Sequence, residues 1–176
     1  MPHSELIWGI LSGTPLWVWV LFAYLMWLGS RSLKPSQVPV RKVAVLPAVF
    51  IIWGLSGLTR HPFPAETIAA FWLGGLAGGL LLGVASGPRL VAVDRDGGGI
   101  IHFPASMLPL IRNLVIFGAH YVLNVMIALR PADAAPLMQA DIAVSGASAG
   151  YFAGWAFMLW QRYRDAPAAP ATASAG

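Results

Sequence analysis

The sequence predicts an all-α membrane protein, a bundle of five transmembrane helices with a short β-hairpin between the third and the fourth. Of its 176 residues, 57% are hydrophobic and only 10% are charged, whereas an average soluble domain has about 25% charged residues. The chain is also rich in tryptophan and glycine. These residue types suit a lipid-embedded bundle, where aromatic rings anchor at the interfaces and small residues let helices pack closely.

Proline, glycine and charged residues separate five apolar segments. Thr14 and Pro15 are typical of an N-cap and the first helical position, so they open the first segment. The predicted spans cover residues 15–30, 43–59, 65–86, 106–129 and 137–163, and a straight span needs roughly 20 residues. The apolar stretch at residues 4–11 is too short to span and is expected to lie in the membrane interface.

Residues 89–103 (RLVAVDRDGGGIIHF) interrupt the apolar pattern. Two short β-rich runs flank Asp96 and Gly97, a strong local signal for a hairpin turn. We therefore expect a β-hairpin outside the membrane. Residues 1–164 then form a single transmembrane domain, and the Ala/Pro/Ser-rich residues 165–176 are expected to be a disordered tail.

The basic residues predict the orientation. If five spans alternate, only Arg60 and Arg130 fall on one side of the membrane. The other side carries Arg31, Lys34, Arg41, Lys42, Arg89, Arg95, Arg162 and Arg164. Because cytoplasmic loops are enriched in Lys and Arg, the N-terminus is predicted to be periplasmic, and the hairpin and C-terminus cytoplasmic.

Composition argues against several function classes. The net charge of +4 comes from residues scattered over short loops, not gathered on one face, so no nucleic-acid partner is expected. The absence of cysteine excludes disulfides, iron–sulfur clusters and thiolate zinc sites. Because the chain contains no H-E-x-x-H, G-x-S-x-G or Walker pattern, we assign no catalytic and no metal-ligating residue. An enzyme would need a partner to supply the missing acid or metal ligands.

Glycines recur every four residues in two of the predicted spans. One row is in the third span and the other is in the fifth, and their members are Gly75, Gly79, Gly83 and Gly87, and Gly146, Gly150 and Gly154. Such rows let two helix backbones approach closely. They indicate either packing within one bundle or an interface with a second copy or another membrane protein.

Polar residues line one face of the fourth span. Asn113, His120 and Asn124 fall close together on a helical projection, and Ser106 joins the same stripe. Polar groups in hydrocarbon are costly, so this face should point into the bundle. Histidine changes its charge near neutral pH, so the stripe favours a proton relay or a polar-ligand site. The alternative is a hydrogen-bonded seam between helices, since Asp141 lies only near the start of the fifth span and no carboxylate is expected deep in the membrane.

No cofactor is evident from the sequence. A haem in a helical bundle usually needs two axial ligands at similar depth, and only His120 lies deep in a predicted span. A haem held by the two His120 side chains of a dimer remains an alternative.

Arg112 is interpreted as an interfacial anchor that reaches the headgroups or pairs with Asp94 and Asp96 in the hairpin.

The opening of the chain resembles a family of small uncharacterised bacterial inner-membrane proteins. The matching features are a T-P-x-W-V-W-like start, a basic loop and a leucine-proline pair, here Thr14, Pro15, Trp17, Val18, Trp19, Arg41, Leu46 and Pro47. The stretch FPASMLPLIRNLVIFGAHY is similar to that family's passage from hairpin to helix. The resemblance implies the topology and a bacterial inner membrane but no activity.

Two functional hypotheses follow. The first is a small transporter-like or ligand-binding module centred on the polar stripe around His120. The second is a non-catalytic accessory or scaffold subunit that uses its glycine rows to associate with itself or with a larger membrane complex. The lipid bilayer is the expected surrounding in both.

Overall fold

The computed structural model describes residues 3–39, 62–89, 92–94 and 99–166. Helices make up most of this part: α1 (His3–Gly13), α2 (Leu16–Arg31), α4 (Ala65–Ala85), α5 (Leu108–Leu129) and α6 (Ala134–Asp165), with a short 3-10 turn, η1 (Pro131–Asp133), before α6. Three strands accompany them: β1 (Ser36–Pro39), β2 (Ala92–Asp94) and β3 (Ile100–Phe103). The predicted span at residues 43–59 and most of the predicted tail lie outside the described residues.

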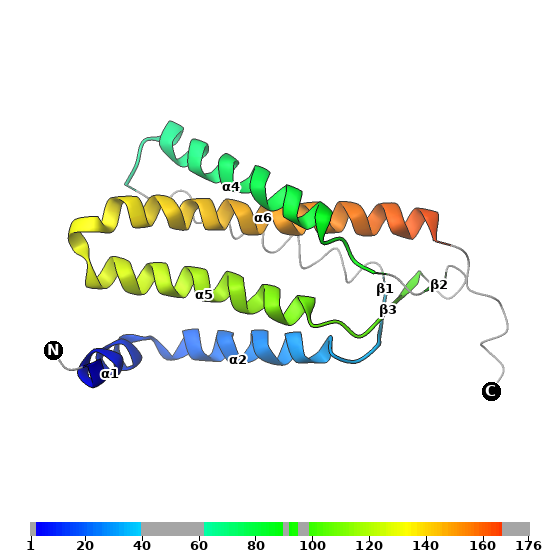
Figure 1. Cartoon of the computed structure of the whole chain (residues 1–176), viewed down its shortest axis with the longest axis horizontal. Helices are drawn as coiled ribbons and strands as arrows, with labels where there is room; N and C mark the ends of the chain where they lie inside the picture. Colours follow the sequence, from blue (N-terminus) through cyan, green and yellow to red (C-terminus); the bar gives the residue numbers. More distant parts are fainter. Residues whose placement is uncertain (1–2, 40–61, 90–91, 95–98, 167–176) are drawn as a thin grey trace.

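The four long helices pack in the spatial order α4, α6, α5 and α2, each against the next (Figure 1). The sheet lies at one end of this row, beside the C-terminal ends of α2, α4 and α6 and the start of α5. Helix α1 lies at the opposite end, near the turn that joins α5 to α6. We call these the sheet end and the α1 end.

Within the described ranges, three helical segments are long and apolar enough to cross a membrane: Ala65–Ala85, Leu108–Leu129 and Pro131–Asp165, which includes η1. Helix α4 has 21 residues, about 32 Å at 1.5 Å per residue, against a hydrocarbon core of about 30 Å. Helix α2 agrees closely with the predicted span at residues 15–30, but its 16 residues reach only about 24 Å. It is therefore a shorter apolar helix.

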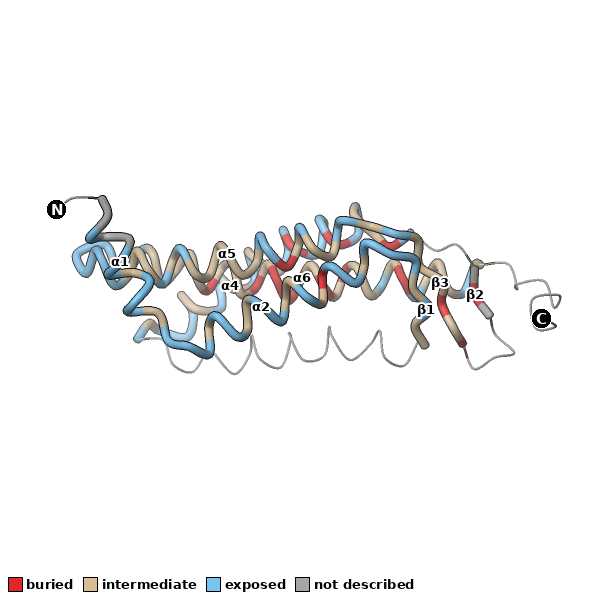
Figure 2. The backbone as a smooth tube through the Cα atoms, turned by 90° about the horizontal axis from the view of Figure 1, so that it is seen from below, coloured by how far each residue is buried: buried red, intermediate tan, exposed pale blue. Residues whose placement is uncertain are grey.

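The helices carry large apolar side chains on their outer surfaces. Leu16 is 77% exposed, Leu81 is 71% exposed and Val115 is 63% exposed. Figure 2 shows that buried residues are concentrated on α6, where it meets α4, and in the sheet. Such an extensive apolar surface suits a lipid surrounding better than water.

The closest helix contact is between α4 and α6, and it depends on both glycine rows. A Cβ atom at Gly75 would overlap the carbonyl oxygen of Ala143, and one at Gly79 would overlap that of Ala147. The relation is reciprocal, since a Cβ at Gly150 would overlap the Leu76 carbonyl oxygen. Gly83, Gly146 and Gly154 make equivalent approaches. The two rows thus face each other within one chain, and only glycine permits this backbone separation.

The sheet has three antiparallel strands in the order β1-β3-β2. Strands β2 and β3 pair within the predicted hairpin at residues 89–103, with Val93 opposite Ile101. Strand β1, from the loop after α2, adds to the other edge with Val38 opposite Ile101. Val93 and Ile101 are fully buried, so the sheet has a small core of its own.

Several predicted boundaries differ from the observed ones. Helix α5 begins at Leu108 instead of residue 106, so Ser106 is not part of the polar stripe. Helix α4 ends at Ala85, which leaves Gly87 outside the helix, where a Cβ would meet the Met158 side chain. Helix α6 begins at Ala134, before the predicted residue 137, because Pro136 lies in its first turn, where the missing N–H is tolerated.

Candidate functional site

His120 and Asp141 form the most distinctive polar contact in the described bundle. Nδ1 of His120 on α5 lies 2.7 Å from Oδ1 of Asp141 on α6. The side chains are 34% and 20% exposed, respectively. At about 1.5 Å per residue, His120 lies roughly 13 Å from the end of α5, and Asp141 roughly 10 Å from the start of α6. The pair is therefore about two turns or more inside the α1 end.

This geometry orients the imidazole. When Nδ1 carries the proton, it donates a hydrogen bond to the carboxylate, which fixes the ring and leaves Nε2 as the second nitrogen. Within the described part of the chain, Nε2 has no hydrogen-bond partner. A carboxylate behind an imidazole also stabilises its positively charged form. The pair can thus hold a proton, or offer Nε2 to a polar ligand.

The predicted polar stripe divides into separate contacts. Asn113 is 6% exposed, and its side-chain amide donates to the Leu25 carbonyl oxygen on α2 at 3.3 Å. Asn124 is exposed and donates to the backbone oxygen of His120 on its own helix at 2.8 Å. Asn113 consequently joins α2 to α5, and neither amide bonds to the imidazole. Among the described side chains, His120 is the one member of this stripe that contacts an ionisable group.

Ser106 has a different place from the predicted one. Its backbone N–H donates to the Ser32 carbonyl oxygen at 2.8 Å, and the Ser32 hydroxyl donates back to the Ser106 carbonyl oxygen at 2.9 Å. The Ser106 hydroxyl accepts from the Leu108 N–H at 3.2 Å. Ser106 therefore fastens the segment before α5 to the end of α2, at the sheet end.

A second contact lies beside the His120–Asp141 pair. The hydroxyl groups of Thr14 and Tyr121 are 3.0 Å apart, which joins the turn between α1 and α2 to α5. The Tyr121 ring stacks on Phe117 with centroids 6.0 Å apart, and its centroid lies 6.3 Å from that of Trp19. This aromatic cluster holds the α1–α2 turn next to the helical turn that carries His120.

Arg112, which the sequence predicts to be an interfacial anchor, lies on α5 about one turn from the start of the helix. Its guanidinium lies among three rings of α6, with Cζ 4.7 Å from the centroid of Phe152, 5.8 Å from Tyr151 and 6.0 Å from Trp155. Its Nε atom is buried and has no hydrogen-bond partner in the described residues. Its predicted partners cannot be compared, because Asp96 and the side chain of Asp94 lie outside the described part of the structure. Arg112 is thus held between α5 and α6, near the sheet end.

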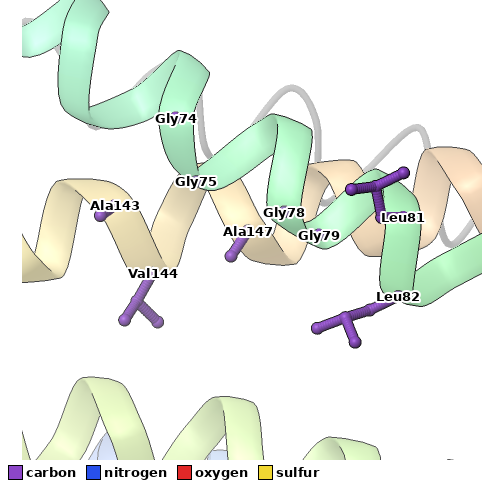
Figure 3. A pocket seen from close by; sticks show the side chains of 9 residues that line it. All are labelled: Gly74, Gly75, Gly78, Gly79, Leu81, Leu82, Ala143, Val144 and Ala147. Carbon is purple, nitrogen blue, oxygen red and sulfur yellow. The ribbon is translucent and has the colours of Figure 1, made fainter.

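A shallow groove of about 540 Å³ lies beside the α4–α6 contact. Figure 3 shows its lining residues, which are the four glycines Gly74, Gly75, Gly78 and Gly79, with Leu81, Leu82, Ala143, Val144 and Ala147. Gly74 and Gly78 form a row next to the one that contacts α6, and no other described residue would meet a Cβ placed on either. The groove is entirely apolar in its side chains.

Sequence reasoning missed Asp141 as the partner of His120. The predicted start of the fifth span at residue 137 places Asp141 near the beginning of that span. The observed start at Ala134 places it almost two turns inside. Pro136 was the signal in the sequence for this earlier start, because a proline is tolerated in the first turn of a helix. Within the described ranges, no group of three His, Cys, Asp or Glu side chains gathers as a metal site.

The fold and the site together define a mostly helical protein. The part that the structure describes has three helices long and apolar enough to span a membrane, with a histidine–aspartate pair between two of them. The chain is similar to an uncharacterized protein of Pasteurella multocida, with 33% identity over 76 residues, which are 43% of this chain and 58% of that protein. It thus spans just over half of that relative's length. No protein-family model and no solved structure matches this chain. The similarity to a protein without an assigned activity agrees with an uncharacterised family.

Proposed function

We propose that this chain is a five-span protein of the bacterial inner membrane that acts as a small transporter-like or ligand-binding module centred on His120. The observation that carries the proposal is the contact between His120 and Asp141, two ionisable side chains well inside two long apolar helices. Ionisable residues within membrane spans are costly, so they are rarely placed there without a functional reason.

The distribution of charge supports the proposed orientation. Among the described residues, the sheet end carries most of the cations: Arg31, Lys34, Arg89, Arg112, Arg162 and Arg164. Arg130 lies at the α1 end, together with Glu5, Glu66 and Asp133. Because positive charge is retained on the cytoplasmic side, the sheet end is the cytoplasmic one in this proposal. The His120–Asp141 pair then lies in the periplasmic half of the bundle.

The pair suits a site that takes up a proton or a polar ligand from the periplasmic side. Asp141 fixes the ring through Nδ1, and Nε2 then accepts a proton or a hydrogen bond from a ligand. The charge that a proton brings to the ring is compensated by the carboxylate at 2.7 Å, without a second cation in the hydrocarbon. Removal of either partner therefore disables the site in this proposal.

Proton uptake into proteoliposomes tests the proposal. The purified protein is reconstituted with a pH-sensitive dye inside the vesicles, and a membrane potential is imposed with potassium and valinomycin. We expect uptake above that of protein-free vesicles, with loss in His120→Gln and in Asp141→Asn. Asn124→Ala is the matched control, because Asn124 lies one turn away and bonds only to its own helix. Equal uptake by His120→Gln and the wild type would exclude a proton site at His120.

The groove beside Gly74 and Gly78 favours a second candidate, an accessory or scaffold subunit that associates with itself or with a larger membrane complex. Two glycines at four-residue spacing with no described neighbour resemble the small-residue rows by which membrane helices associate. Gly78→Leu would fill the groove. If the chain is such a subunit, this variant loses the oligomer or co-purifying protein that the wild type retains in mild detergent, and the His120 variants keep it.

A further inference from the structure

Aromatic rings and a side-chain hydrogen bond to Tyr151 surround the charge of Arg112, and no described carboxylate pairs with it. A guanidinium carries five N–H donors and stays protonated under all physiological conditions. Arg112 has ring faces of Tyr151, Phe152 and Trp155 around it, and within the described side chains it forms no ion pair with a carboxylate. Ring faces recover only part of the hydration that a buried cation loses. A bound anion would complete this environment.

The surroundings of Arg112 select the kind of anion. The Tyr151 hydroxyl accepts a hydrogen bond from Ser86 at the end of α4 at 2.9 Å, and the Trp155 ring stacks on Phe103 of β3 at 6.4 Å. The rings around Arg112 are thereby fixed by α4 and by the sheet. Arg112 as a residue keeps intermediate exposure, although its Nε atom is buried. A guanidinium fork held in place among rings matches the geometry of a phosphate group.

The position of the site points to the source of the phosphate. Arg112 lies in the second turn of α5, at the end of the bundle that carries most of the described cations. At this level, Trp27 is 54% exposed with Arg31 over its ring, and Trp160 is 53% exposed with Arg164 over its ring. Outward tryptophans paired with arginines are typical of the headgroup layer, where the cytoplasmic leaflet is rich in anionic lipids.

We propose that Arg112 anchors a binding site for the phosphate group of an anionic lipid headgroup, between α5 and α6 at the sheet end. The site lies apart from the His120–Asp141 pair. It depends on the membrane-spanning arrangement proposed above but not on any proton chemistry at His120. Inorganic phosphate is the soluble source of the same chemistry, and the experiment separates the two.

Lipid retention by the purified full-length protein tests this site. The protein is exchanged into detergent with phosphatidylglycerol or with phosphatidylcholine, and bound lipid is counted by native mass spectrometry. We expect the wild type to retain phosphatidylglycerol about tenfold more strongly than Arg112→Gln, since a charge-assisted phosphate contact is lost. Arg112→Lys, which keeps the charge but not the fork, should fall between them. This conservative variant also serves if Arg112→Gln does not fold.

Arg31→Gln is the matched control, because Arg31 is exposed, lies at the same end and also contacts a tryptophan ring. If it loses as much lipid as Arg112→Gln, the attraction is diffuse and the site is refuted. Equal retention of the two lipids by the wild type, with no stabilisation by inorganic phosphate, also refutes it. Stabilisation by millimolar phosphate alone, abolished in Arg112→Gln, would assign the same site to a soluble phosphate. His120→Gln must retain lipid like the wild type, whatever its proton uptake.

One internal competitor is tested in the same way. If Asp94 or Asp96 were the anion for Arg112, Asp94→Asn with Asp96→Asn would lower the melting temperature as much as Arg112→Gln does, and the wild type would show no lipid preference. That result would overturn the proposal. We expect the double variant to keep the wild-type preference for phosphatidylglycerol.

Discussion

The Nδ1 atom of His120 lies 2.7 Å from Oδ1 of Asp141, and this contact joins α5 to α6 well inside their apolar lengths. Elsewhere, α6 packs on α4 through backbone contacts at glycine, whereas toward α5 it presents a carboxylate. The face of α6 toward α4 therefore allows close backbone packing, and the face toward α5 carries one member of the ionisable pair. Both properties can be measured separately.

The His120–Asp141 pair should contribute a measurable coupling free energy. His120→Gln, Asp141→Asn and the double variant form a double-mutant cycle, read from melting temperatures in detergent. Because both side chains keep some exposure, we expect a coupling of about 1 kcal/mol. If the destabilisations of the two single variants add up fully in the double variant, the contact contributes no coupling free energy.

The glycines at the α4–α6 contact should tolerate no methyl group. Gly79→Ala and Gly150→Ala place a Cβ against the carbonyl oxygens of Ala147 and Leu76, so each should destabilise the protein by about 1–3 kcal/mol. Gly74→Ala is the control, since no described residue would meet its Cβ. Its melting temperature should equal or slightly exceed that of the wild type, because alanine favours a helix. Similar losses of stability in all three variants would contradict the observation that the glycine rows of α4 and α6 face each other.

Engineered cysteines should report the pairing of β1 with β3. The chain has no cysteine, so any disulfide arises from the introduced pair. Gln37 lies opposite His102, and facing residues of antiparallel strands have a separation that a disulfide can bridge. We expect Gln37→Cys with His102→Cys to crosslink under mild oxidation. The control pair, Gln37→Cys with Ile100→Cys, is out of register and should not crosslink. If the control pair crosslinked faster than Gln37→Cys with His102→Cys, the observed register would be refuted.

Reporter fusions should place the two ends of α6 on opposite sides of the membrane. With five spans and a cytoplasmic sheet end, a fluorescent protein after Gly176 should fluoresce, and alkaline phosphatase after Asp133 should be active. Expression levels measured by immunoblot control for unstable fusions. Active phosphatase after Gly176 would rule out the five-span arrangement, though not the contact between His120 and Asp141.

The positions of the long helices could be predicted from the sequence, because a membrane-crossing segment is a local property. Its length is set by the bilayer, and its ends are set by prolines and charges that lie within it. Helices α4 and α5 thus begin and end within about two residues of the predicted bounds. The pairing of β2 with β3 was predictable for the same reason, since the dipeptide Asp96-Gly97 is a strong local signal for a hairpin in the sequence.

The candidate site could be predicted only in part. His120 attracts attention as an ionisable residue in an apolar run, but its partner depends on how α5 and α6 are placed against each other. Because α6 begins three residues earlier than expected, Asp141 lies almost two turns inside the helix instead of near its start. Asn113, His120 and Asn124 share a helical face, yet they contact α2, α6 and their own helix, respectively.

The sequence by itself determined that long apolar helices dominate the chain, where most of them lie, how the basic residues are distributed and that two glycine rows are present, because each depends on composition or on local spacing. The tertiary structure alone decided that those rows face each other, that β1 joins β3, that Arg112 lies among the rings of α6 and that His120 meets Asp141. Each of these joins residues far apart in the chain. Such contacts depend on the packing of whole helices and strands, which no local pattern encodes.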